Sequence, residues 1–259
     1  MQHSFLSSFA SVTIAVVLFI AIILTYGIAN RIAKNKKNKD SVPGDFGPVE
    51  GALLGLLALL LAFTFSMSAS RHDMRRQIIV DEANNIGTAI LRADLYADST
   101  RQLFRTDFAA YVEARIAYYS AGMNEEKTAQ ALELTNTIAA KIWNRAAVLA
   151  HDHDNLISSN QMIPALNSMI DIVTTRVAGG NATVPDSILW MLFMLCLVSS
   201  FIIGYNRKEQ KSSRMIIIVF SLMISASVFL ILDLDRPRQG LINMDASNSH
   251  IIELREMFK

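Results

Sequence analysis

The sequence of 259 residues has little charge, cysteine, proline and glycine, and each shortage excludes a class of protein. Only 18% of its residues are charged, against about 25% in an average soluble domain. Its 24 Lys and Arg are balanced by 23 Asp and Glu, which excludes a basic nucleic-acid-binding protein. One cysteine, Cys196, allows neither a disulfide framework nor a cysteine-cluster zinc site, and five prolines with eleven glycines leave little room for a disordered tail. With 52% hydrophobic residues and a mean hydropathy of +0.32, the chain is expected to be a membrane protein.

The hydrophobic residues are concentrated in four runs that contain no charged residue. These runs cover residues 5–29, 51–70, 187–206 and 215–232. A bilayer core about 30 Å thick needs about 20 apolar residues in a helix, so each run is long enough to cross it. The first run lacks the positively charged start and the small-residue cleavage site of a secretory signal peptide, so we interpret it as a span. The predicted fold class is an all-α membrane protein with four transmembrane helices.

A polar segment of domain size separates the second span from the third. It is too polar to be embedded in a bilayer, so we expect it to form an extramembrane helical bundle. The expected parts are the first two spans (1–70) with a basic loop (30–48), the bundle (71–186), the third and fourth spans (187–235) with a basic hairpin (205–214), and a C-terminal tail (236–259).

Lysine and arginine are concentrated in the two short loops, and this bias sets the orientation of a membrane protein. The first loop contains five such residues and the hairpin contains four. Both loops are therefore expected in the cytoplasm, which places the N-terminus, the bundle and the C-terminus outside the plasma (inner) membrane. Arg71, Arg75 and Arg76 directly follow the second span and oppose this orientation, but nine positive residues outweigh three.

The extramembrane segment is expected to be helical throughout, because its apolar residues recur at helical spacing and no stretch alternates with period two. The second span is expected to run on into this segment without a break. Ala121 and Gly122 should end one helix, and Asn124 is a candidate N-cap of the next. Pro164 is expected in the first turn of a later helix, and residues 179–181 at its end. The apolar stripes are Phe104, Phe108, Val112, Ile116 and Tyr119; Leu132, Ala139, Ile142, Ala146 and Leu149; and Leu166, Met169, Ile170, Val173 and Val177.

Three blocks of the sequence resemble those of the bestrophin-like membrane proteins. They are GALLGLLALLLAFTFSMSASRHDMRRQIIVDEANNIGTAILR at 51–92, LNSMIDIVTTRVAG at 166–179 and LDLDRPRQGLI at 232–242. The last is similar to the family's Asp-x-Asp-Arg-Pro-Arg-x-Gly block. The resemblance extends from about residue 45 to residue 259. It implies a membrane protein remotely similar to bestrophins, which are pentameric anion channels with four spans per subunit.

The polar residues of the second span and its continuation fall on one side of the helix. The stripe consists of Leu53, Leu57, Thr64, Ser68, Arg71, Arg75 and Glu82. At 100° per residue, its last five members lie within about 60° of one another. In an oligomer, the stripe would form a pore with an apolar constriction, a hydroxyl-lined stretch and a ring of positive charge that favours anions. In the alternative interpretation, the hydroxyls lie at helix contacts and the arginines reach the lipid headgroups.

Charged residues of both signs surround a proline at the end of the fourth span. They are Asp233, Asp235, Arg236 and Arg238, around Pro237. Alternating signs beside a helix-stopping proline favour a buried pairing network. We expect this group to pair with the arginines that follow the second span, Arg71, Arg75 and Arg76, because both groups lie at the same membrane surface.

No residue pattern indicates catalysis or a cofactor. The sequence contains no phosphate-binding glycine loop, no nucleophile elbow and no HExxH motif. His151, Asp152, His153 and Asp154 are of metal-ligand type, but the two histidines are two residues apart and point to different sides of a helix. We interpret this cluster as a solvated helix end. The chain is therefore expected to be neither an enzyme nor a metal-binding protein.

These features predict a homo-oligomeric ion channel or pore in the lipid bilayer, with the second span lining the pore. Inorganic anions are the expected ions, and no nucleic acid is expected as a partner. The alternative is a non-conducting membrane scaffold or sensor whose helical bundle binds a ligand or a partner protein.

Overall fold

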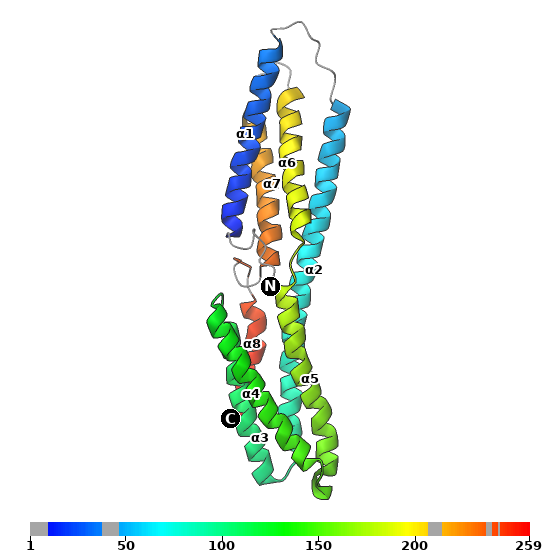
Figure 1. The fold of residues 1–259 in the computed structure, drawn as a ribbon, viewed down its shortest axis with the longest axis vertical. Coiled ribbons are helices and arrows are strands. Elements are labelled where there is room, and N and C mark those ends of the chain that lie inside the picture. The colour runs from blue at the N-terminus through cyan, green and yellow to red at the C-terminus, as the bar shows by residue number, and fades with distance from the viewer. Residues whose placement is uncertain (1–9, 38–46, 207–213, 237–239, 243) are drawn as a thin grey trace. The chain divides into compact units, whose positions relative to one another are not determined.

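The computed structural model describes residues 10–37, 47–206, 214–236, 240–242 and 244–259, and these residues contain helices but no strand (Figure 1). This architecture confirms the all-α fold class. Four of the helices are long and apolar enough to cross a membrane. The chain divides into two compact units. The membrane unit consists of Met1–Arg71 and Thr183–Ile242, and the bundle unit consists of His72–Ala182 and Asn243–Lys259.

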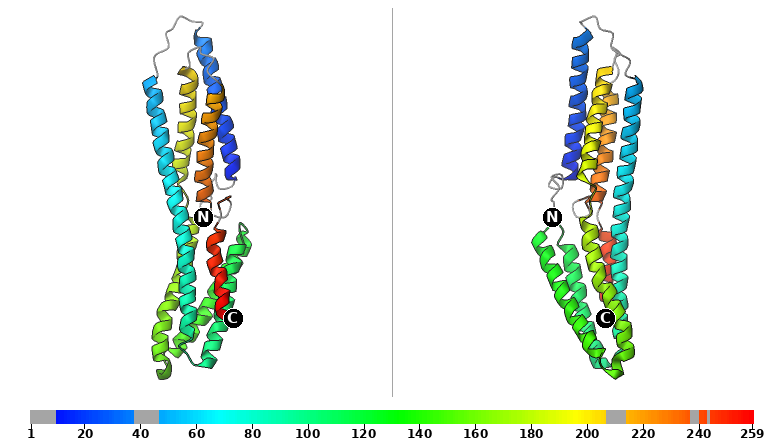
Figure 2. Two further views of the ribbon diagram at one scale, coloured as in Figure 1. Left: turned by 180° about the vertical axis from the view of Figure 1, so that it is seen from behind. Right: turned by 45° about the vertical axis from the view of Figure 1, so that its right-hand side comes forward.

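The membrane unit contains the four apolar helices, and each of them overlaps a predicted span, although residues 5–9 of the first predicted span lie outside the described residues. They are α1 (Ser11–Lys37), the first part of α2 (Gly47–Ala93), α6 (Asp186–Asn206) and α7 (Arg214–Asp235). Within this unit α1 packs against both α6 and α7, as both views of Figure 2 show. The apolar core of the unit includes Ile22, Leu57, Leu192 and Val228, all at most 1% exposed.

Small residues allow α1 and α6 to approach each other closely. The Ser200 hydroxyl donates a hydrogen bond of 2.7 Å to the carbonyl oxygen of Ile22. At Gly204, an added Cβ atom would lie 2.6 Å from the carbonyl oxygen of Tyr26 and 3.1 Å from its Cα. Lipid is as apolar as leucine, so helices in a membrane associate through such close van der Waals contacts. The packing therefore requires glycine at position 204.

The bundle unit has its own hydrophobic core. It contains the second part of α2 together with α3 (Asp98–Ser120), α4 (Glu125–Leu149), α5 (Leu156–Asn181) and α8 (Asp245–Glu253), and the short 3-10 helices η2 (His153–Asn155) and η3 (Leu254–Phe258). α3 packs against α4 and α8, and α4 packs against α5. The largest fully buried apolar side chains of the core are Ile86, Ile90, Phe104, Phe108, Tyr111, Ile142, Met162, Leu166 and Met169.

The helix α2 is 47 residues long and continues from the membrane unit into the bundle unit. This continuity confirms the prediction that the helix of the second span runs on into the following segment without a break. Its physical basis is the sequence between Gly55 and Gly87, which contains neither glycine nor proline. Such a stretch has no residue that favours a helix break.

The helix ends of the bundle agree with the sequence at three positions, including the end of α5 at Asn181, and differ at a fourth. The Asn124 side chain accepts a hydrogen bond of 2.9 Å from the Lys127 amide, which confirms it as an N-cap. Gly122 follows α3 with a φ of 55°, a conformation that glycine adopts without strain. The placement of Pro164 in a first turn is wrong, because α5 already begins at Leu156. Asp152 caps η2 directly before it, so the helical segment starts earlier than the proline.

Residues 236–259 contain more structure than the expected C-terminal tail. α8 and η3 pack on the bundle unit, where Met244, Ile251 and Leu254 are part of its core. Outside that core, the Arg255 guanidinium donates two hydrogen bonds of 2.7 Å to the Glu113 carboxylate. The segment is polar on average, so its composition does not indicate that these three apolar residues lie on one face in the folded chain.

Candidate functional site

The predicted stripe occupies one face of α2, and most of that face is buried within the chain. Leu57, Thr64, Ser68, Arg75 and Glu82 are buried, and Leu53 and Arg71 are partly buried. The Thr64 hydroxyl donates a hydrogen bond of 2.6 Å to the Leu60 carbonyl oxygen of its own helix. A side chain that lines a pore between subunits is exposed on the single chain. The burial therefore disfavours a pore-lining role for this stripe and favours the alternative of helix contacts.

The opposite face of α2 in the membrane unit is exposed and differs in composition from the exposed faces of the other spans. α1, α6 and α7 expose mainly large side chains such as Leu24, Met194 and Leu222. The exposed face of α2 combines small and hydroxyl residues with four large apolar ones. Its members are Gly51, Ala52, Gly55, Leu56, Ala58, Leu59, Ala62, Phe63, Phe65, Ser66 and Ser70. We call this set the outer face of α2.

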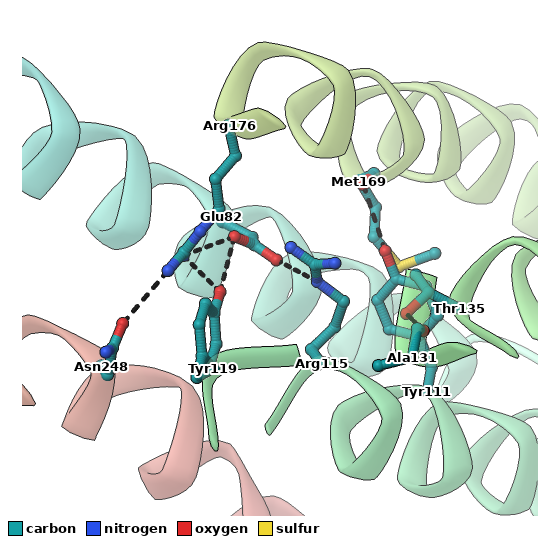
Figure 3. Close-up of polar contacts among 9 residues, drawn as sticks. All are labelled: Glu82, Tyr111, Arg115, Tyr119, Ala131, Thr135, Met169, Arg176 and Asn248. Carbon is teal, nitrogen blue, oxygen red and sulfur yellow. Dashed lines mark hydrogen bonds and ion pairs between the residues drawn. The ribbon is translucent and has the colours of Figure 1, made fainter. Parts of the chain in front are cut away.

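A buried charge cluster surrounds Glu82 in the bundle unit (Figure 3). Its carboxylate accepts a hydrogen bond of 2.5 Å from Arg115 Nε, one of 2.8 Å from Arg176 Nη1 and one of 2.7 Å from the Tyr119 hydroxyl. Arg176 Nη2 in turn donates to the Asn248 side-chain oxygen at 3.1 Å. The five side chains come from α2, α3, α5 and α8. The cluster therefore joins four helices through one carboxylate.

The two guanidinium groups decide the ionisation of Glu82. Burial by itself would raise the pKa of this carboxyl, but the charges and hydrogen bonds of Arg115 and Arg176 outweigh it and lower the pKa below its ordinary value. Burial raises the pKa of Tyr119 well above its ordinary value, so this hydroxyl stays a neutral donor. The cluster thus contains an ionised carboxylate between two permanent cations.

Sequence reasoning singled out Glu82 but missed its partners. Arg115 lies on the same helix face as Phe108, Val112 and Tyr119, and a charged residue within a buried apolar stripe is the signal that could have identified it. Arg176 lies in the block at 166–179 that carries the family resemblance. Asn248 lies in the segment interpreted as a tail and gave no signal of its own.

Arg75 links α2 to the end of α5 through two hydrogen bonds. Its Nε donates a hydrogen bond of 3.0 Å to the carbonyl oxygen of Gly179, and its Nη2 donates one of 2.5 Å to that of Ala182. The last carbonyls of a helix lack partners within it, and a cation near them is favourable. Arg75 therefore contributes to the structure of the bundle unit.

Two aspartates in the last turn of α7 accept hydrogen bonds from backbone amides of other segments. The Asp233 carboxylate accepts hydrogen bonds from the amides of Leu241 at 3.0 Å and Ile242 at 2.8 Å. The Asp235 carboxylate accepts one of 2.9 Å from the amide of Val184. The pairing of Asp233, Asp235 and Arg236 with Arg71, Arg75 and Arg76 stays a prediction, and Arg238 lies outside the described residues.

The described part of the chain contains no group of three or more His, Cys, Asp or Glu side chains that could hold a metal ion. His151, Asp152, His153 and Asp154 are all exposed. The Asp152 carboxylate accepts hydrogen bonds from the Asp154 amide at 3.2 Å and from the Asn155 side chain at 2.7 Å. This cluster therefore lies at a solvated turn between α4 and α5.

These helices and their contacts define a four-span integral membrane protein with an extramembrane helical unit. The chain belongs to the bestrophin-like family, because the model of the bestrophin-like domain matches residues 8–248. This match confirms the resemblance that the three sequence blocks carry. No curated protein matches the sequence.

Solved structures with the same fold include a bacterial bestrophin homologue from Klebsiella pneumoniae. That structure is 15% identical with a TM-score of 0.67, and the match covers 94% of this chain and 98% of the other. A point mutant of the same homologue has a TM-score of 0.69 at 14% identity, with the same coverage. A further structure, described as that of a membrane protein with a point mutation, has a TM-score of 0.67 at 16% identity, again with the same coverage. At these identities the likeness shows the fold.

Proposed function

We propose that the protein is a homo-oligomeric ion channel whose conduction path is lined by the outer face of α2. The observation that carries this proposal is the composition of that face. Small residues in a membrane favour close helix contacts, and the large exposed side chains of α1, α6 and α7 suit contact with lipid. Membership of the bestrophin-like family supports the proposal.

The outer face of α2 has the two parts that a gated pore needs. Leu56, Leu59 and Phe63 follow one another along it, and rings of such side chains in an oligomer would form an apolar constriction that gates by dewetting. Ser66 and Ser70 come next and offer hydroxyl groups to a hydrated ion. This arrangement keeps α2 as the lining helix and replaces the buried stripe by the opposite face.

We propose inorganic anions as the permeant ions. Arg76 is exposed in the turns of α2 that follow its apolar part, whereas Arg71 belongs to the stripe on the opposite side of the helix. A ring of positive charge at a pore mouth raises the local anion concentration.

Current recording from purified protein in planar bilayers tests this function. Leu59→Ser should raise the open probability, because a hydrated constriction loses its dewetting barrier. Val16→Ser on α1 is the matched control, since Val16 is 51% exposed and Leu59 is 53% exposed. Arg76→Gln should shift the reversal potential in a KCl gradient toward weaker anion preference.

Two results would contradict the proposal in different ways. A folded oligomer that passes no current over a range of voltage and pH would favour a non-conducting scaffold or sensor. Currents that respond equally to Leu59→Ser and Val16→Ser would keep the channel but remove the outer face of α2 from its pore.

We propose that the bundle unit lies outside the plasma (inner) membrane, because the two short loops carry most of the positive charge. Arg75, which opposes this orientation, is buried and binds two carbonyl oxygens. In a Cys196→Ser background, Ser120→Cys should react with an impermeant thiol reagent on intact cells, and Asn35→Cys should not. Both positions are exposed. The opposite labelling pattern would place the bundle unit in the cytoplasm.

A further inference from the structure

The Arg115 guanidinium in the bundle unit is fully buried, yet only one of its three nitrogens has a hydrogen-bond partner in the described part of the chain. Nε donates to Glu82, whereas Nη1 and Nη2 are buried without a partner among the described residues. These two nitrogens carry four of the five N–H donors of an arginine. Buried donors in proteins are normally hydrogen-bonded. The N–H groups at the Nη edge of Arg115 therefore need a hydrogen-bond acceptor.

The cluster around Arg115 also carries one positive charge too many. Arg115 and Arg176 are two cations, and Glu82 is the one anion among the described residues that they contact. Burial alone would lower the pKa of Arg115, but Glu82 outweighs burial and raises it, so the guanidinium stays charged. Burial raises the pKa of Tyr111 and of Tyr119, so both remain neutral. An unbalanced buried charge is costly unless a counter-charge accompanies it.

The Nη edge is the side of the Arg115 guanidinium at which the described residues offer no hydrogen-bond partner. In Figure 3 both Nη atoms point toward α5, between Glu82 and the Tyr111 hydroxyl. The ring of Tyr118 covers the plane of the guanidinium, with its centroid 4.7 Å from Cζ. The Tyr111 hydroxyl is 3.5 Å from the Met169 carbonyl oxygen, which is long for such a bond, so its hydrogen can turn to a better acceptor.

We propose that a small monovalent inorganic anion of the halide class binds at the Nη edge of Arg115, with the Tyr111 hydroxyl as a further donor. Such an ion accepts hydrogen bonds from the unpartnered N–H groups and cancels the excess positive charge, whereas a water molecule would meet only the first need. The ion acts as a structural part of the bundle unit. The proposal does not depend on whether the protein conducts ions.

Thermal unfolding of the purified full-length protein in chloride tests the site. Circular dichroism at 222 nm should show a transition temperature that rises with chloride and saturates, relative to sodium gluconate at equal ionic strength. Arg115→Met should abolish this rise. Arg105→Met is the matched control on the same helix, because Arg105 is only half-buried and pairs with Asp94, and it should keep the wild-type response.

A variant that removes the negative charge of the cluster should bind chloride more tightly. Glu82→Gln removes the carboxylate that Arg115 contacts, so its half-saturating chloride concentration should fall by about tenfold or more, by Coulomb's law at an effective dielectric constant of about 20. The chloride dependence of Glu82→Gln tests the anion site even if Arg115→Met does not fold. A bromide-soaked crystal should show an anomalous peak at the Nη atoms of Arg115.

Three results would overturn the proposal. The first is a wild-type transition that is the same in chloride and gluconate. The second is an Arg115→Met response equal to that of the wild type, which would place the chloride effect elsewhere. The third is density at the Nη atoms without a bromide peak, which would identify water there.

Discussion

Neutralising Glu82 should destabilise the bundle unit more than neutralising any exposed charged residue of that unit. Glu82→Gln keeps the size of the side chain but removes the carboxylate that the buried Arg115 and the partly buried Arg176 contact, and the comparison is made in sodium gluconate so that no halide replaces it. Breaking a buried ion pair by removing one partner costs about 3–5 kcal/mol, because the remaining charge is left uncompensated. The three hydrogen bonds to the carboxylate are part of this cost and are not added to it.

This free energy corresponds to a large change in the transition temperature. For chains of about 150–250 residues, 1 kcal/mol shifts the transition by about 2–4 °C, so we expect a decrease of about 6–20 °C. The two tryptophans suit the assay, because Trp143 lies in α4 and Trp190 in α6. In a Trp190→Phe background, the fluorescence of Trp143 reports the bundle unit alone.

The matched control is Glu113→Gln, which breaks the ion pair with Arg255. Both side chains of this pair are about half exposed, and exposed pairs contribute little to stability. A decrease for Glu82→Gln no larger than that for Glu113→Gln would refute the reasoning, because it would mean that the two arginines do not need the carboxylate.

The remaining predictions concern pH, helix packing and the block after the fourth span. Since the folded-state pKa of Glu82 lies below the ordinary 4.5, its stabilisation is complete above that value and is lost only as pH falls through the lower folded-state pKa. The difference in transition temperature between wild type and Glu82→Gln, measured from pH 8 to pH 3, should therefore stay constant down to about pH 5; an increase in this difference between pH 7 and pH 5 would show a raised pKa instead, because a group with a raised folded-state pKa adds stability as pH falls. Gly204→Ala should destabilise the membrane unit by about 1–3 kcal/mol, because its Cβ would meet the Tyr26 carbonyl oxygen. Gly27→Ala on α1, whose Cβ meets nothing within 4 Å, should be neutral or stabilising, and equal effects of the two on Trp190 fluorescence unfolding would contradict the close contact. Asp235→Ala should lower the transition temperature far more than Asp171→Ala, since Asp235 is buried against the Val184 amide and Asp171 is exposed; similar decreases would exclude a structural role for Asp235.

The number of spans and the helical class of the protein follow from the amino-acid sequence alone. The four charge-free runs are long enough to cross a bilayer. Such runs form helices in a bilayer, because each helix satisfies its own backbone hydrogen bonds. Local signals also predicted the N-cap at Asn124 and the unbroken course of α2, since both depend on residues close together in the chain. The three blocks at 51–92, 166–179 and 232–242 identified the family for a similar reason, because each is a continuous stretch of sequence.

Only the tertiary structure decided which side of α2 is buried. A helical wheel places Thr64, Ser68 and Arg75 on one face, but it cannot show whether that face meets other helices of the same chain or a pore. The partners of Glu82 were likewise hidden, because Arg115, Arg176 and Asn248 are 33, 94 and 166 positions away along the chain. Charges that pair across such separations leave no periodic pattern, so only the folded chain shows that one carboxylate holds two arginines.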